Sequence, residues 1–166
     1  MRCPTIENNC LSGGSRPVTT AACSLRAQVF HQPSSDGDPC MQSVNPTTIP
    51  APNGTYSHGV LLHRPENLLF ISGQVAIDKT GAIPDSLEAQ AELVWNNLHA
   101  ILKDAGMSIT NVVKLMSFLT RAEDFADFAR IRARHLGAHR PASTLLVVSA
   151  LAHPKFLVEV EAIAVR

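Results

Sequence analysis

The chain closes on the segment Val158-Glu159-Val160-Glu161-Ala162-Ile163-Ala164-Val165, which is its most informative stretch. The segment is short, rich in β-branched residues and free of Pro and Gly, so it predicts a β-strand. Side chains alternate along a strand, which puts Glu159 and Glu161 on one face and Val158 and Val160 on the other. Carboxylates in an apolar strand are costly to bury unless they are paired or functional. This strand therefore locates the candidate site.

The elements before this strand follow from the same reasoning. A strand is predicted at residues 144–148, within the stretch Arg140-Pro141-Ala142-Ser143-Thr144-Leu145-Leu146-Val147-Val148. Three earlier strands are predicted at Tyr56–His63, Leu68–Ile77 and Val112–Leu119. Helices are predicted between these strands, one capped by Asp85 with Glu88 and ended by Gly106, the other capped by Thr120 with Glu123 and ended by Gly137.

This order, β-β-α-β-α-β-β, predicts an α+β sandwich with two helices on one face of the sheet. The strands 144–148 and 156–165 are apolar on both sides, and no helix remains to cover the second face. Because a monomer rarely exposes so much apolar sheet, we expect a symmetric oligomer that covers it. Clefts between subunits would then lie beside the two carboxylates.

Composition divides the chain into two regions. We expect residues 1–43 to be a disordered N-terminal extension and residues 44–166 to form one domain, because the first forty residues are rich in Ser, Thr, Pro, Gly and Asn without a sustained period. Three explanations remain open for the extension: an organellar presequence, a secretory signal, or translation that begins at Met41, which we favour.

Charge and cysteine content restrict the function classes. Fourteen basic and fourteen acidic residues cancel, so no global field attracts nucleic acid or anionic lipid, and no apolar run reaches membrane-spanning length. All four cysteines precede residue 41, at spacings too wide for a structural zinc site. A cysteine-free domain suits a reducing compartment, so we expect a cytoplasmic protein without a metal.

At this point the residues resemble a known family. Motifs in this order and spacing resemble those of the RidA family (YjgF type), from about Asn45 to the C-terminus: Thr55-Tyr56-Ser57-His58-Gly59-Val60, Ile71-Ser72-Gly73-Gln74-Val75, Trp95-Asn96-Asn97-Leu98, Asn111-Val112-Val113-Lys114, Asp124-Phe125, Arg140-Pro141-Ala142-Ser143-Thr144 and Glu159-Val160-Glu161-Ala162-Ile163-Ala164.

The resemblance implies a chorismate-mutase-like α+β fold and a homotrimer with clefts between subunits. It implies cofactor-free and metal-free hydrolysis of small reactive enamines or imines, such as 2-aminoacrylate or 2-iminopropanoate, to 2-oxo acids and ammonia. By the same resemblance, Glu159 positions the water, while Tyr56 and the Ser72-Gly73 pair line the cleft.

Two family residues do not carry over. The resemblance expects an arginine that grips the substrate carboxylate, and Ser143 holds its position. A family asparagine is also replaced, near Ala129. Arg140 is the nearest cation along the chain, but it lies three positions before Ser143, an odd offset, so in an extended strand it points to the opposite face. We therefore expect altered substrate recognition, with Ser143 and Arg140 as candidate binding residues.

Imine hydrolysis needs a proton on nitrogen, a positioned water and a group that accepts the proton of the water. A carboxyl group does this where burial or a like-charged neighbour raises its pKa towards neutrality. We assign the acid/base role to Glu159 and a structural role to Glu161. The alternative is that both pair with basic residues of a neighbouring subunit.

Two other functions remain open. The first is a non-catalytic trimer that binds a small metabolite in the same cleft. The second, weaker alternative is an RNA-associated translation inhibitor or ribonuclease, suggested by the basic helix end Arg130, Arg132, Arg134 and His135. Cations at a helix C-terminus usually lie on its solvated face, so we expect no nucleic-acid partner.

Overall fold

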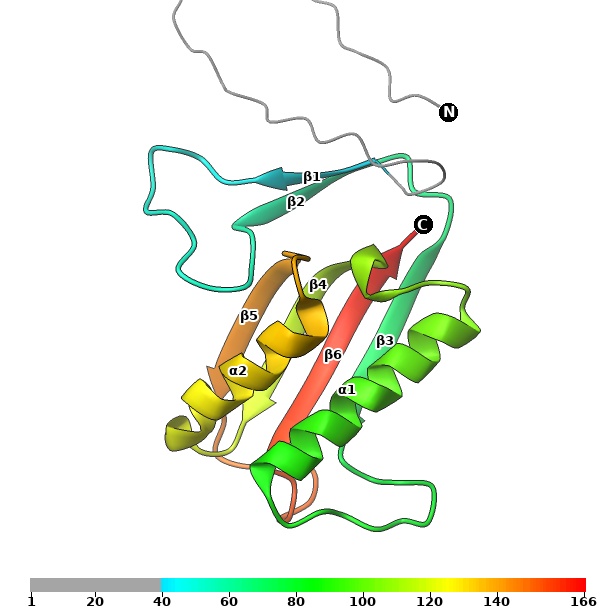
Figure 1. Ribbon diagram of the computed structural model, residues 1–166, viewed down its shortest axis with the longest axis vertical. Coiled ribbons are helices and arrows are strands. Elements are labelled where there is room, and N and C mark those ends of the chain that lie inside the picture. Colours follow the sequence, from blue (N-terminus) through cyan, green and yellow to red (C-terminus); the bar gives the residue numbers. More distant parts are fainter. Residues whose placement is uncertain (1–39) are drawn as a thin grey trace, which may run out of the picture. The chain divides into compact units, whose positions relative to one another are not determined.

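Two long helices and a four-stranded sheet form the body of the molecule (Figure 1). The computed structural model describes residues 40–166, and the predictions for residues 1–39 lie outside the described residues. In chain order the strands are β1 (Cys40–Val44), β2 (Gly59–His63), β3 (Leu68–Val75), β4 (Val112–Leu119), β5 (Ala142–Val147) and β6 (Val158–Val165). The helices are α1 (Leu87–Asp104) and α2 (Phe125–Leu136), each followed or preceded by a short 3-10 turn, at Ile109–Asn111 and Ala122–Asp124.

The main sheet has the strand order β3-β6-β4-β5. Strand β6 lies between β3 and β4 and is antiparallel to both, whereas β5 is parallel to β4 at the edge. The segment at residues 158–165 is therefore an inner strand of the sheet. The α+β class and the two-helix arrangement are confirmed.

Strand β1 was not predicted. It pairs antiparallel with β2 in a separate two-stranded sheet, from Cys40 opposite His63 to Val44 opposite Gly59. The domain therefore has regular structure four residues before the boundary that we placed at residue 44. A five-residue strand of mixed character, CMQSV, is too short for alternation to reveal it.

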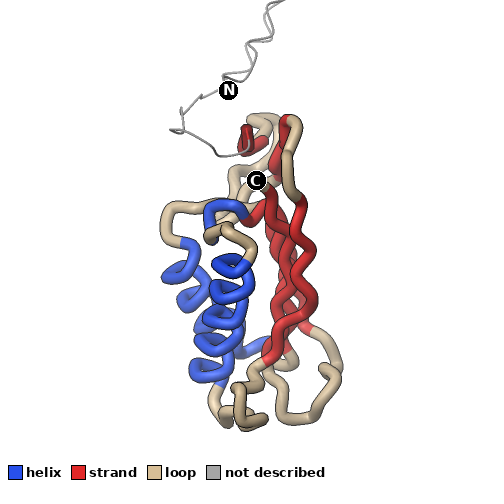
Figure 2. The backbone as a smooth tube through the Cα atoms, turned by 90° about the vertical axis from the view of Figure 1, so that its right-hand side faces the viewer, coloured by secondary structure: helices blue, strands red, loops and turns tan. Residues whose placement is uncertain are grey.

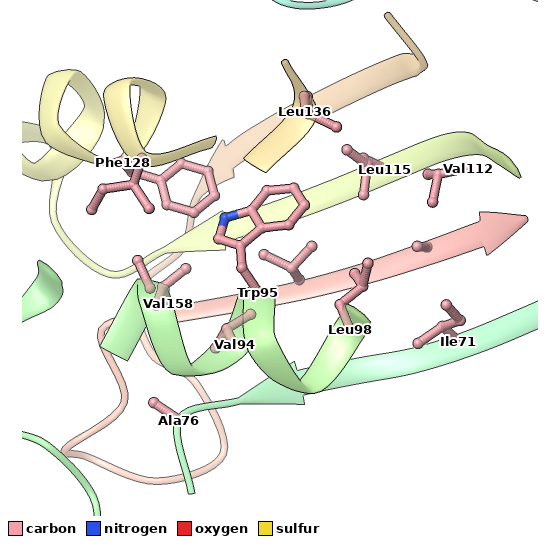
Figure 3. Packing of buried hydrophobic residues seen from close by; sticks show 14 of the residues in the cluster. Ile71, Ala76, Val94, Trp95, Leu98, Val112, Leu115, Phe128, Leu136 and Val158 are labelled. Carbon is pink, nitrogen blue, oxygen red and sulfur yellow. The ribbon is translucent and has the colours of Figure 1, made fainter. Parts of the chain in front are cut away.

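Both helices lie on the same side of the sheet, and no element of residues 40–166 covers the other side (Figure 2). Between the two layers, the indole of Trp95 is fully buried at the centre of the core (Figure 3). Around it pack α2 through Phe128, β4 through Leu115 and β6 through Val158. Burial of these side chains is the main force that fixes the helices on the sheet.

The N-cap of helix α1 is Ser86, one residue later than the predicted cap Asp85. The Ser86 hydroxyl accepts a hydrogen bond from the amide of Ala89, at 3.2 Å, and Gly106 follows the helix with φ +68°. The predicted cap of α2, Thr120 with Glu123, is wrong, because the 3-10 turn Ala122–Asp124 precedes the helix and makes Asp124 its N-cap. The Asp124 side chain makes no capping hydrogen bond, because its carboxylate binds Arg121 instead. Gly137 ends α2 with φ +56°, as predicted.

A buried amide fixes the entry to β6. The Gln90 side chain of α1 is fully buried, and its Nε2 donates to the carbonyls of Pro84 and Lys155 at 2.7 and 2.8 Å. Its Oε1 accepts from the amide of Leu157, at 2.8 Å. The loop that leads into β6, and hence Glu159 two residues after Leu157, is thereby tied to the helix layer.

Within residues 40–166, neither helix combines the length and the apolar character that crossing a membrane requires.

Candidate active site

The two carboxylates of β6 lie on the side of the sheet that the helices leave open. Val158 and Val160 are fully buried beneath the helices, and Glu159 and Glu161 alternate with them and are half-buried. The predicted alternation is therefore confirmed. In the sheet, Glu159 lies opposite Val75 of β3 and Phe118 of β4.

A β-bulge in β3 accommodates Glu159. The pairing with β6 shifts between Ile71 and Gln74, so that Ser72 and Gly73 lie opposite the single residue Glu161. A Cβ atom on Gly73 would lie 1.8 Å from Oε1 of Glu159, far inside contact distance. The bare backbone at Gly73 is what allows the carboxylate to occupy this place, as the Ser-Gly interruption of the strand suggested.

Glu159 has no side-chain partner of its own within residues 40–166. Neither it nor Glu161 takes part in an ion pair or a side-chain hydrogen bond there. The carboxylate thus keeps its acceptor positions for a water molecule, a ligand or another subunit. Ser72, which precedes Gly73 in the bulge, is exposed. These three residues form what we call the Glu159 group: Ser72, Gly73 and Glu159.

A second group of predicted site residues surrounds a pocket of about 280 Å³. Tyr56 and Ser143 both line it, together with the loop residues Asn53 and Gly54. Helix α2 and strand β5 supply the remaining walls through Phe125, Ala129, Arg132 and Leu145. We call it the Arg132 pocket, because that residue sets its charge.

Backbone contacts hold Tyr56 at this pocket. The amide of the next residue, Ser57, donates to the carbonyl of Pro141 at 3.0 Å, and Ser57 forms an isolated parallel bridge with Ala142. The buried Ser57 hydroxyl donates to the carbonyl of Arg140 at 2.8 Å. The loop at residues 53–57 is therefore fastened to the start of β5, which places Tyr56 beside Ser143.

The prediction that Arg132 lies on the solvated face of its helix is wrong. We placed it with the solvated cations of the helix end, but it is only 7% exposed and its Nη1 approaches the Ser143 hydroxyl at 3.4 Å. Burial lowers the pKa of the Arg132 guanidinium below its usual value, and the neighbouring Tyr56 opposes this in part. The guanidinium nevertheless stays cationic, because an arginine does not lose its proton in a protein.

The other cations of this region have partners. Arg134 pairs with Glu88 and Glu92, and Arg130 pairs with Glu88 and Asp127. These two arginines lie on the solvated face as predicted. Their charge is largely balanced, which weakens the case for an RNA contact at this helix end.

Arg140 does not line the Arg132 pocket. Its Nη1 donates to the carbonyl oxygens of Gly137 and His139, at 2.6 and 2.8 Å. It therefore satisfies acceptors at the C-terminal end of α2, a common arrangement for a cation at that position. The structure gives it no contact with Ser143.

The Glu159 group and the Arg132 pocket lie on different faces of one sheet. Ser143 is opposite Leu115, whose side chain is buried on the helix side of β4. Glu159 is opposite Phe118, whose side chain alternates to the open side. The predicted site residues are therefore brought together in two groups, Ser72, Gly73 and Glu159 in one, Tyr56 and Ser143 in the other.

A signal for Arg132 was present in the sequence. Phe125, Ala129 and Arg132 follow the spacing i, i+4, i+7 and so share one side of α2. The core stripe of the same helix runs through Phe128, Ile131 and Leu136. An arginine that continues an apolar stripe beside the core stripe differs from the solvated arginines at 130 and 134.

Within the described range 40–166, no three His, Cys, Asp or Glu side chains are arranged so that they could hold a metal ion.

Comparison with known proteins identifies the family of the chain. A sequence model of the family described as Endoribonuclease L-PSP matches residues 47–166, which is most of the chain. The chain belongs to the RidA/YjgF family. This confirms the resemblance stated above.

The alignments with two relatives in this family extend over most of each relative's length. A RutC family protein of Pyrococcus horikoshii is 39% identical over 120 residues, which are 70% of this chain and 91% of the relative. The 2-iminobutanoate/2-iminopropanoate deaminase of Rattus norvegicus is 34% identical over 126 residues, 74% of this chain and 88% of that protein.

Solved RidA/YjgF structures have the same fold. A Rid family protein from Yersinia pestis aligns with a TM-score of 0.68 and 32% identity, over 76% of this chain and 98% of that chain. RidA from an Antarctic Psychrobacter aligns with a TM-score of 0.58 and 34% identity, over 75% and 99% of the two chains.

Proposed function

We propose that this protein is a cofactor-free, metal-free hydrolase of small reactive enamines and imines, which it converts to 2-oxo acids and ammonia. Glu159 is the catalytic acid/base, and the protein acts in the cytoplasm as a homotrimer with clefts between subunits. The observation that carries the proposal is the Glu159 carboxylate, held over the bare backbone of Gly73 with no side-chain partner in residues 40–166. Membership of a family that includes an imine deaminase at 34% identity supports the reaction class.

Each step of the reaction can be assigned to this carboxylate. Water adds to the carbon of the protonated imine, forming the C–O bond, and Glu159 takes the proton that the water releases. Glu159 then returns this proton to the nitrogen of the tetrahedral intermediate. The C–N bond breaks and ammonia leaves. Glu159, again a carboxylate, takes the proton of the remaining hydroxyl and passes it to the ammonia, so the products are the 2-oxo acid and ammonium. One carboxyl group thus acts first as base and then as acid.

The reaction needs an oligomer because, within one chain, Glu159 and the Arg132 pocket lie on opposite faces of the sheet. Glu159 lies on the open face and the Arg132 pocket on the helix side, so a complete cleft takes one group from each of two subunits. The open face also supplies an apolar surface for association, since Phe70 is 71% exposed and Leu68 is 55% exposed. Exposed aromatic and aliphatic residues on one sheet face favour a subunit interface there.

The test compares Glu159→Gln with Glu161→Gln. The two carboxylates lie two residues apart on the same strand face, so the second substitution controls for loss of charge. We measure ammonia release from freshly generated 2-iminobutanoate. Removal of a general acid/base lowers kcat/KM roughly 100-fold or more, so Glu159→Gln should approach the spontaneous rate while Glu161→Gln stays close to wild type.

A wild-type protein that releases ammonia no faster than buffer would favour the rival function, a non-catalytic trimer that binds a small metabolite. Equal losses in the two variants would remove the special role of Glu159.

A further inference from the structure

The Arg132 guanidinium is a buried cation without a counter-charge in the described chain. It is 7% exposed, and no carboxylate of residues 40–166 pairs with it. Its Nε is buried without a hydrogen-bond partner, and its Nη1 has only the hydroxyl of Ser143 at 3.4 Å. Arg130 and Arg134 on the same helix pair with carboxylates, so among these three arginines only Arg132 lacks a carboxylate partner within residues 40–166.

Such an arrangement is costly unless an anion completes it. A buried charge needs a partner, and an arginine cannot discharge itself by losing a proton. Its planar donors suit the two oxygens of a carboxylate better than one neutral hydroxyl. A protein that keeps an unpaired guanidinium in a pocket therefore has a ready site for an anion.

The walls of the pocket restrict the size and character of that anion. Phe125, Ala129 and Leu145 form apolar walls, and Tyr56 with Ser143 adds hydroxyl groups. A volume of about 280 Å³ suits a small molecule rather than a chain segment. The side chains together fit a small carboxylate with a short apolar tail and one further hydrogen-bonding group.

We infer that Arg132 binds the carboxylate of a small 2-oxo or 2-imino acid. It thereby replaces, from helix α2, the strand arginine whose position Ser143 occupies. The identity of the acid rests on the proposed function; the binding of a carboxylate by Arg132 does not. Ser143 is then a small neighbour that leaves room for the long side chain from the helix.

Binding of 2-oxobutanoate, measured by isothermal titration calorimetry on the full chain, tests this inference. Arg132→Met keeps an unbranched apolar stem and removes the guanidinium charge, and Arg130→Met makes the same change at an exposed position. We expect Arg132→Met to weaken binding roughly 10- to 100-fold, and Arg130→Met to leave it unchanged. The neutral amide of the same acid should bind wild type and Arg132→Met equally.

Relocating the charge gives a second test. Ser143→Arg alone places two guanidinium groups side by side, so it should not strengthen binding. The double variant Arg132→Met with Ser143→Arg returns a single arginine to the strand, and it should recover most of the lost affinity. Failure of this double variant to recover any affinity, while it remains folded, would contradict the inference.

Stability of the ligand-free protein separates ligand binding from a structural role. If Arg132 has no anionic partner in the ligand-free protein, Arg132→Met removes an unpaired buried charge, and Tm should stay equal or rise. If a carboxylate of a second copy neutralises Arg132, the same change should lower Tm and weaken the assembly. The latter outcome would overturn the inference.

The two proposals can fail separately. Arg132-dependent binding without any ammonia release would end the proposed reaction and leave the carboxylate site standing. Ammonia release with the same KM in wild type and Arg132→Met would end the carboxylate site at Arg132 and leave the proposed reaction standing.

Discussion

At the scale of single residues, the close approach of Gly73 and Glu159 is the most restrictive feature of the site. A methyl group at position 73 would overlap the carboxylate, so Gly73→Ala should displace Glu159 from its place. We predict that kcat/KM for 2-iminobutanoate falls roughly 100-fold, as for loss of the general acid/base itself.

The matched control is Gly59→Ala in β2. There the added methyl group would meet its nearest atom, on Val44, at an ordinary 3.5 Å. Gly59→Ala should therefore keep wild-type activity, and equal activity in Gly73→Ala would show that the position of Glu159 is unimportant.

A site residue could be predicted from the sequence where its role depends only on its neighbours along the chain. Glu159 and the Ser72-Gly73 interruption follow from strand alternation and from glycine chemistry, both of which act over a few residues. The pocket of Tyr56, Ser143 and Arg132 joins a loop, a strand and a helix. Only the packing of α2 against β5 decides that Arg132 turns inwards while Arg130 and Arg134 remain in solvent.

At the scale of elements, Gln90 connects helix α1 to the entry of β6. Its buried amide makes three hydrogen bonds to backbone groups, so Gln90→Ala leaves those groups without partners. Each buried unsatisfied group costs about 1–3 kcal/mol, so we predict a loss of about 3 kcal/mol or more in the free energy of unfolding. Asn96→Ala on the exposed side of α1 should change it by less than about 0.5 kcal/mol.

Urea denaturation monitored by circular dichroism measures both values. If Gln90→Ala proved as stable as Asn96→Ala, the amide would not be what fixes the start of β6.

A pH-dependent contact joins the two helices. Burial first, and the charge of His135 second, lower the pKa of His99 from its ordinary 6.5. The ring nitrogens of the two histidines lie 3.3 Å apart, and His135 also contacts Glu92 at 2.9 Å. Because the folded state holds the His99 proton less tightly, the unfolded chain takes it up first as pH falls. The contribution of neutral His99 to the free energy of unfolding is therefore fully present above its unfolded pKa of about 6.5 and is lost as the pH falls below it.

We predict that the urea midpoint of wild type falls between about pH 7 and about pH 5.5, and that His99→Asn reduces this fall. The exposed His63 provides the control through His63→Asn, which should leave the pH profile unchanged. Glu92 acts in a lower range, since its hydrogen bond from Arg134 lowers its pKa from 4.5. An unaltered profile in His99→Asn would contradict the assignment.

The elements themselves were largely predictable, because periodicity is a short-range property. Five of the strands and both helices follow from alternation, apolar stripes and terminal glycines. The exceptions have physical causes. Strand β1 is too short to show a pattern, Asp124 precedes α2 where Thr120 with Glu123 was expected, and Ser86 caps α1 where Asp85 with Glu88 was expected. Both residues are good caps, and only the geometry of the preceding loop chooses between them.

At the scale of the whole molecule, the open face of the sheet is where association is expected. Phe70 is the most exposed large apolar side chain of the described residues. We predict that Phe70→Lys lowers the mass in solution from a trimer towards a monomer, because a buried unpaired ammonium is strongly disfavoured. Ala100→Lys, on the exposed side of α1, should leave the mass unchanged.

Size-exclusion chromatography with light scattering measures this change. A wild-type protein that is monomeric at working concentrations would contradict the oligomer, and with it the assembly of the site from two chains.

The central claim is that Glu159 of one subunit works with the Arg132 pocket of another, and a mixing experiment tests it most directly. Glu159→Gln and Arg132→Met chains are denatured together in equal amounts, refolded and assayed for ammonia release from 2-iminobutanoate. Each variant alone should be nearly inactive. If sites form between subunits, roughly a quarter of the clefts in the mixture combine an intact Glu159 with an intact Arg132, and activity should return to about that fraction of wild type. A mixture as inactive as its components would contradict the account.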